Sequence, residues 1–308
     1  MVGSQANIIL DNNGTPRAGF AYFAIDDYRG LRYVSLPYSD YTDPIVNSVE
    51  DWDLLIDNLI ETNRPIKLRC LRTDIPLLDS RFVLTNEAKW HQVDIRRHDI
   101  DEMWSNIHPS ARRAVNKARR SDVHVEFRND KDALRAFFEM HLDVRKNKYN
   151  LLPQPYSFFE EIWEQFLKPG HGVLAMAIHE DKFIGATLNL FWKDTFYYKF
   201  SASSLDDLAV RPTDLIIWES ICYAKRQNLS FVDFGVSDID QEGLVRFKNK
   251  YATSEETISF LERGTGELDP SSQQIQAVFD ELTGLLTDES VPADIIAKAG
   301  DLLYRFFV

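Results

Sequence analysis

The stretch Phe196-Tyr197-Tyr198-Lys199-Phe200-Ser201-Ala202-Ser203 decides the fold, because it predicts a strand that leads into a helix and then a second strand. The helix spans 212–227, with apolar residues at helical spacing and a proline in its first turn. The short apolar run at 231–234 predicts the closing strand. Strands are also predicted just before the quoted stretch, at 173–178 and 183–192. This part of the chain therefore predicts an α/β unit.

The same order of elements occurs earlier in the chain. The two series are offset by roughly 165 residues, which aligns Trp52 with Trp218 and Tyr33 with Tyr197. We interpret this as internal duplication, and the alternative is coincidence between two ordinary α/β segments. The earlier strands are predicted at 8–10, 19–25, 31–36 and 66–71, with a helix at 48–61.

Charge and cysteine content exclude several classes of protein. The chain has 308 residues and a net charge of −13, which excludes a basic nucleic-acid-binding surface over the whole chain. Cys70 and Cys222 are the only cysteines and lie far apart, so we expect no disulfide framework, no metal site and a cytoplasmic location. No run approaches the roughly 20 apolar residues that span a bilayer. We expect neither a transmembrane segment nor a signal peptide.

Helical segments are predicted between the two series and after them. The final part, 265–308, holds eight acids and two bases, and we expect a linker at 264–272 followed by helices at 273–286 and 292–307. The apolar end of this tail must pack on the body or on a partner. We favour the body, and a homodimer through the tail is the alternative. The helices between the series are predicted at 99–107, 110–121, 130–148 and 156–167.

Four stretches together resemble the Fem-like branch of the GNAT acyltransferase superfamily, the branch related to peptidoglycan-bridge aminoacyltransferases. The segment Leu36-Pro37-Tyr38-Ser39-Asp40-Tyr41 also resembles the family's first half, and only the acidic tail lies outside the match. The four stretches are Arg112-Arg113-Ala114-Val115-Asn116-Lys117-Ala118 leading to Val123-His124-Val125, the stretch 196–203 quoted above, Arg211-Pro212-Thr213-Asp214-Leu215-Ile216-Ile217-Trp218-Glu219 leading to Phe231-Val232-Asp233-Phe234-Gly235, and Gly243-Leu244-Val245-Arg246-Phe247-Lys248-Asn249-Lys250-Tyr251.

The resemblance implies both a fold and a reaction. The fold is α/β (α+β), with tandem GNAT-like halves at 1–105 and 106–262 and a helical tail at 263–308. Each half would be a mixed, mostly antiparallel twisted sheet flanked by helices. The reaction is transfer of an acyl or aminoacyl group to an amine, with acyl-CoA or aminoacyl-tRNA as donor and no tightly bound cofactor. The acceptor would be a cell-wall precursor or another conjugated amine.

Lys248 and Asp233 are the expected catalytic residues. Attack of an amine on an ester or thioester creates an oxyanion, which a nearby cation stabilises. The resemblance places Phe247-Lys248 near the donor, so Lys248 would stabilise the oxyanion or hold a donor phosphate. A solvated helix lysine is the alternative. Asp233 ends a predicted buried strand, where it would orient the acceptor amine or cap the following turn. We expect both residues at one crevice, where the later sheet opens.

Five further residues are expected near this crevice. Arg211 and Asp214 flank a helix start, where anions are favoured, although an exposed arginine without a partner is the alternative. Tyr198 and Lys199 are consecutive on the central strand, so one of them must face the site if the other faces the core. Glu219, one residue after Trp218, is expected to reach the same crevice.

Two departures from the family pattern concern the donor. The stretch 208–213 lacks the glycines of a pyrophosphate-binding loop, which argues against simple acetyl-CoA use. No long helical arm of the tRNA-using members is predicted. However, Arg112 and Arg113 belong to a basic run that would meet tRNA, a nucleotide-linked precursor or a phosphate. The alternative is a solvated helix face.

Two non-catalytic functions remain open from the sequence. A degenerate GNAT pair would act as a binding module for a nucleotide-linked or envelope precursor. The acidic tail would instead make the chain a partner-binding scaffold.

Overall fold

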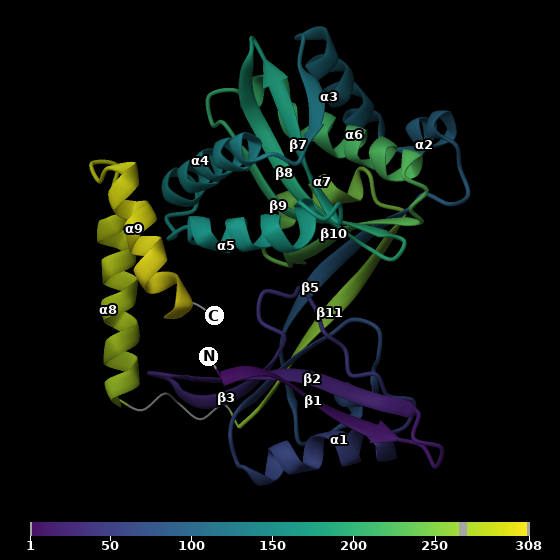
Figure 1. Cartoon of the computed structure of the whole chain (residues 1–308), viewed down its shortest axis with the longest axis vertical. Helices are drawn as coiled ribbons and strands as arrows, with labels where there is room; N and C mark the ends of the chain where they lie inside the picture. Colours follow the sequence, from purple (N-terminus) through teal and green to yellow (C-terminus); the bar gives the residue numbers. More distant parts are fainter. Residues whose placement is uncertain (1, 265–269, 307–308) are drawn as a thin grey trace.

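A computed structural model describes residues 2–264 and 270–306 and places their strands in one continuous sheet of eleven (Figure 1). The order across the sheet is β1-β2-β3-β4-β11-β5-β10-β9-β8-β7-β6. Neighbouring strands are antiparallel except for the pairs β3–β4 and β9–β10, which are parallel. The strands are β1 (Val2–Leu10), β2 (Pro16–Asp27), β3 (Gly30–Ser35), β4 (Ile66–Cys70), β5 (Val83–Asp94), β6 (His124–Arg128), β7 (Gly172–His179), β8 (Lys182–Trp192), β9 (Thr195–Ser203), β10 (Phe231–Asp238) and β11 (Ser254–Arg263).

Helices cover the sheet, and several begin at side chains that cap them. Ser48 accepts a hydrogen bond from the Asp51 amide, and Asp130 accepts one from the Ala133 amide, so each satisfies a free N–H of a first turn. Asp99 forms a capping box with Glu102. The helices are α1 (Val49–Glu61), α2 (Ile100–Asn106), α3 (Pro109–Arg120), α4 (Lys131–Asn147), α5 (Tyr156–Ile162), α6 (Pro212–Arg226), α7 (Glu242–Asn249), α8 (Pro270–Leu286) and α9 (Ala293–Leu303).

The two predicted halves repeat one arrangement. In the first, α1 packs Trp52 and Ile56 against β2 and β4. In the second, α6 and α3 cover one face of β7–β10, while α4 and α5 cover the other (Figure 1). In each half the parallel strands pair only briefly, through 33–34 with 66–67 and through 195–197 with 231–233. The tandem, mixed α/β prediction is therefore confirmed.

Two long strands join the halves (Figure 1). β5 pairs with β10 of the later half over 88–94, and β11 pairs with β4 of the earlier half over Ser259–Arg263. β5 and β11 also pair with each other along most of their length. Residues 254–262, expected in the second half, thus complete the sheet of the first.

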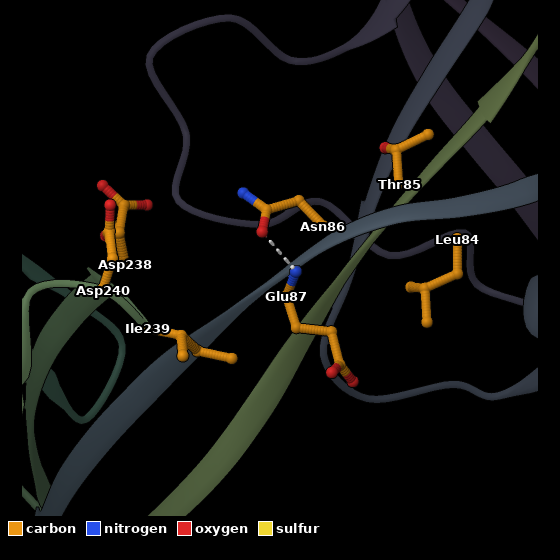
Figure 2. A pocket seen from close by; sticks show the side chains of 7 residues that line it. All are labelled: Leu84, Thr85, Asn86, Glu87, Asp238, Ile239 and Asp240. Carbon is orange, nitrogen blue, oxygen red and sulfur yellow. Dashed lines mark hydrogen bonds between the residues drawn. The ribbon is translucent and has the colours of Figure 1, made fainter.

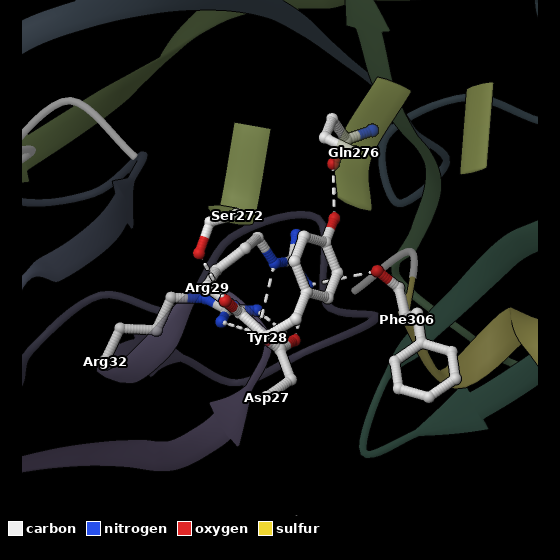
Figure 3. A network of polar contacts seen from close by, with 7 residues as sticks. All are labelled: Asp27, Tyr28, Arg29, Arg32, Ser272, Gln276 and Phe306. Atoms are coloured by element: carbon white, nitrogen blue, oxygen red, sulfur yellow. Dashed lines mark hydrogen bonds and ion pairs between the residues drawn. The ribbon is translucent and has the colours of Figure 1, made fainter. Parts of the chain in front are cut away.

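The acidic tail packs on the body, as favoured from the sequence. Ile296 and Ala299 of α9 are buried in the core formed with α4 and α5. Figure 3 shows the contacts near β2 and β3: Ser272 donates to the Tyr28 carbonyl at 2.6 Å, and Arg29 donates to the Phe306 carbonyl at 3.1 Å. The expected linker falls largely on 265–269 and the expected helix end on Phe307, both outside the described residues.

An ion pair buried beneath this contact connects β2 with β3. Arg32 donates to Asp27 at 2.7 Å, and both side chains are less than one-tenth exposed (Figure 3). Burial alone would raise the pKa of Asp27, but the Arg32 and Arg29 guanidinium groups hold it well below its usual range. None of the helices within 2–264 and 270–306 is long and apolar enough to cross a bilayer.

Candidate active site

A cavity of about 890 Å³ lies where β9 and β10 diverge. The two strands pair only as far as Tyr197 and Asp233, and the cavity is lined by the residues that follow on each strand. The start of α6, the helix α7 and the end of α4 complete its wall. Beyond Tyr197, β9 still pairs with β8 on one side but no longer pairs with β10 on the other. This second edge of β9 is therefore open toward the cavity. Six of the predicted site residues line this cavity: Tyr198, Lys199, Arg211, Asp214, Phe247 and Lys248.

Lys248 is a buried cation at the cavity wall. Its side chain comes from α7, it is only 5% exposed, and its Nζ donates to the carbonyls of Val236 at 2.7 Å and Gly235 at 3.3 Å. Burial lowers its pKa to about 8, although the carboxylates of Asp40 and Asp233 oppose this effect. The structure therefore excludes the alternative of a solvated helix lysine.

Asp40 reaches the cavity from the first half and was not among the expected site residues. Its Oδ1 accepts a hydrogen bond from Lys199 Nζ at 3.0 Å. Gly235 has a φ of +65°, and a Cβ there would lie 2.6 Å from Asp40 Oδ2, so a larger residue would strain the backbone and displace the Asp40 carboxylate. The sequence offered one signal, because Asp40 lies in the 36–41 segment that resembles the family's first half.

Asp233 lies beneath the cavity and does not line it. Its Oδ1 accepts from the Trp90 indole at 2.9 Å and from the Gly235 amide at 2.7 Å, and its Oδ2 accepts from the Tyr41 hydroxyl at 3.4 Å. Burial raises its pKa, which these two donors to Oδ1 partly offset. These contacts match the turn-capping alternative, because Asp233 holds the Gly235 turn whose carbonyl accepts a hydrogen bond from Lys248.

The remaining lining residues provide polar groups around the opening. Asp214 is buried and accepts a hydrogen bond from the Tyr251 hydroxyl at 2.7 Å. Arg211 stands exposed before α6 with a φ of +64°, at the position where a glycine would be unstrained. Burial raises the pKa of Tyr198 to about 12, so its hydroxyl stays protonated at neutral pH.

One family of protein domains is similar to part of this chain. Residues 106–249 match the acetyltransferase (GNAT) domain family. This segment, slightly less than half of the chain, is therefore similar to GNAT acetyltransferase domains. No curated protein matches the chain significantly.

Several solved structures share the fold of this chain over most of its length. A FemX structure is 14% identical, with a TM-score of 0.62, covering 83% of this chain and 87% of its own. The C-terminal domain of a putative lysylphosphatidylglycerol synthetase from Agrobacterium fabrum is 12% identical, with a TM-score of 0.58, covering 90% and 87%. A tandem GNAT protein from the clavulanic acid biosynthesis pathway is 10% identical, with a TM-score of 0.53, covering 86% and 85%. At these identities the likeness concerns the fold alone.

Three of the expected site residues lie away from the cavity. Glu219 accepts a hydrogen bond from Arg119 of α3 at 2.8 Å, because one step along α6 from Trp218 rotates it by about 100°. Arg112 donates to the carbonyls of Trp104, Ser105 and Ile107, and so caps the end of α2. Arg113 is exposed on α3, where anion binding stays a prediction.

The loop before α6, at 208–213, has no glycine. Residues Leu208–Val210 form a single 3₁₀ turn that leads to Arg211. The part of the chain described here holds no group of three or more histidine, cysteine or acidic side chains arranged for a metal ion. The groups that line the cavity include cations, carboxylates, hydroxyls and the open edge of β9, together with apolar side chains such as Leu208, Phe234 and Leu244.

Proposed function

We propose that this chain transfers an acyl or aminoacyl group from a thioester or ester donor to an amine, at the cavity between β9 and β10. The observation that carries the proposal is Lys248, a buried cation at the wall of a large cavity inside a GNAT domain. A buried charge acts in a medium of low dielectric, where it stabilises an oxyanion more strongly than in water.

Two side chains have separate roles in the proposed reaction. The acceptor nitrogen bonds to the donor carbonyl carbon, and Lys248 stabilises the oxyanion with an N–H that its two backbone carbonyls leave over. Asp40, beside Lys199 on the same cavity, orients the acceptor amine, which reacts in its uncharged form, and accepts the proton that its nitrogen loses as the new bond forms. The bond to the leaving sulfur or oxygen then breaks, and the leaving group takes up that proton. Asp233 acts through the Gly235 turn as a positioning residue.

The donor and the acceptor follow from the surroundings of the cavity. The open edge of β9 can bind the amides of an extended donor, as in an acyl-CoA, while Arg211 offers a cation for a phosphate. Aminoacyl-tRNA is the other donor to test. A fold shared with FemX and a putative lysylphosphatidylglycerol synthetase supports an acceptor of the cell envelope. The cytoplasmic location stays a prediction.

A transfer assay tests this function. The purified chain is incubated with labelled acyl-CoAs or charged tRNA and with nucleotide-linked precursors or small amines, and products are identified by mass spectrometry. We expect Lys248→Ala to lose at least about a hundred-fold in kcat with little change in donor binding. Arg246→Ala removes an exposed cation from the same helix and should leave turnover unchanged. Donor binding without turnover in the unmodified chain would favour the non-catalytic binding module.

A homodimer through the tail also stays a prediction. The helix α9 packs on the body, but α8 keeps several apolar side chains exposed at helical spacing. These side chains are Ile275, Val278, Leu282 and Leu285.

A further inference from the structure

A groove of about 700 Å³ lies beside β5, next to the point where its pairing with β10 ends (Figure 2). β10 pairs with β5 only as far as Asp238 opposite Ala88. β5 continues to Val83 and stays paired with β11 on its other side. In the described part of the chain, no strand occupies the β10 side of Leu84–Glu87.

The backbone of Glu87 faces this open edge. Successive residues of a strand turn their amides toward opposite neighbours. The Ile95 amide donates to Ser230, just before β10, and counting back in steps of two places Glu87 on the same side. Its N–H donates instead to the side chain of Asn86, at 2.8 Å (Figure 2). The Asn86 side chain thus supplies the acceptor that the carbonyl of a paired strand would otherwise provide.

The lining of the groove is acidic and partly apolar. Glu87, Asp238 and Asp240 contribute carboxylates, and the described lining residues include no lysine or arginine. Leu84 is 49% exposed and Ile239 is 46% exposed. An open strand edge with these side chains fits an extended peptide that carries cations and apolar groups in alternation.

We propose that this edge binds an extended, cationic peptide segment of the acceptor as an added β-strand. Asp240 lines both the groove and the cavity of Lys248, so a bound segment lies next to the proposed site of transfer. The assignment of this peptide as acceptor rests on the proposed acyl transfer. The binding itself does not, because it involves only the β5 edge and the carboxylates.

The first test changes the ligand. A fluorescent heptapeptide of alternating lysine and valine, blocked at both ends, is titrated with the full chain and followed by fluorescence anisotropy. We expect saturable binding that weakens as salt rises. Methylation of alternate backbone nitrogens should weaken binding about ten-fold through lost main-chain hydrogen bonds. A glutamate–valine peptide should not bind. Equal affinity for the methylated peptide would overturn strand addition.

The second test changes the protein. Asn86→Ala frees the Glu87 N–H, so we expect about two- to five-fold tighter binding. Glu87→Gln should weaken binding about three-fold through the lost charge, and Glu87→Pro more strongly because it also removes the N–H. Glu61→Gln, an exposed carboxylate at the end of α1, is the matched control and should change nothing. Unchanged affinity in both Asn86→Ala and Glu87→Pro contradicts the proposal.

Three results separate this proposal from the proposed function. Lys248→Ala should bind the peptide with normal affinity while losing transfer. Peptide that binds but is not acylated by any donor keeps the edge site and removes the assignment as acceptor. Transfer to small amines without peptide binding keeps the enzyme and removes the edge site.

Discussion

Replacement of Lys248 by methionine tests whether a cation is buried at the cavity wall. Methionine keeps the unbranched shape and removes the charge. The pKa of Lys248 is about 8 in the folded chain, against an ordinary value of 10.5. Between these pH values the unfolded chain holds one more proton, so the free energy of unfolding rises with pH. At about 1.4 kcal/mol per pKa unit, the full rise is about 3 kcal/mol.

The assay is urea unfolding, followed by tryptophan fluorescence, from pH 7 to pH 10. The difference in unfolding free energy between the parent and Lys248→Met isolates this one group, because all other titrations occur in both proteins. Below pH 8 both the folded and the unfolded parent carry the charge, and burial of that charge costs stability. We expect the difference to move in favour of the parent by about 2 to 3 kcal/mol across the range.

A flat difference would refute the reasoning, because it would mean that Nζ stays hydrated and titrates normally. The pH dependence of transfer provides an independent check. If the cation stabilises the oxyanion, kcat should fall as pH rises through about 8. A rise in kcat through the same pH would instead assign Lys248 as the base.

Three other predictions concern structure and assembly. Gly235→Ala should lower the unfolding free energy by about 1–3 kcal/mol in urea, because of its positive φ and the contact with Asp40, whereas Gly243→Ala, which meets open space, should cost far less. Arg32→Met should cost about 3 kcal/mol at pH 7, and the difference should shrink as pH falls below about 4, since Asp27 is then protonated in the unfolded chain. If the tail forms a homodimer, Val278→Glu should shift a concentration-dependent dimer to monomer in sedimentation velocity, while an unshifted dimer would place the interface elsewhere.

The sequence predicted most elements with strong apolar periodicity and missed several others, among them β5, β6, β11 and α7. The strands and helices of both repeated series occur in the structure, although β1 begins at Val2 rather than at residue 8 and β10 extends to Asp238 rather than ending at residue 234. β5 and β11 were not predicted as strands. Residues 83–87 of β5 are all exposed, and β11 begins with Ser254-Glu255-Glu256, so neither carries a clear apolar alternation. Their pairing comes from tertiary contacts between the halves.

The site was predicted in part, for a related reason. Family motifs located Lys248 and its lining neighbours, but they did not say which groups from the other half would meet them. Asp40 reaches the cavity through a contact that spans 159 residues with Lys199, and no local pattern encodes that distance. Glu219 was expected at the crevice from nearness in sequence, whereas helix geometry turns it away.

The position of β11 has a consequence for how the chain is synthesised. β11, at 254–263, lies between β4 and β5, so the sheet of the first half stays incomplete while most of the chain is still being translated. Domains usually fold in order as they leave the ribosome. Here the edges of β4 and β5 that pair with β11 stay unpaired and exposed until β11 has been synthesised. Chaperone dependence and aggregation of truncated translation products are therefore expected.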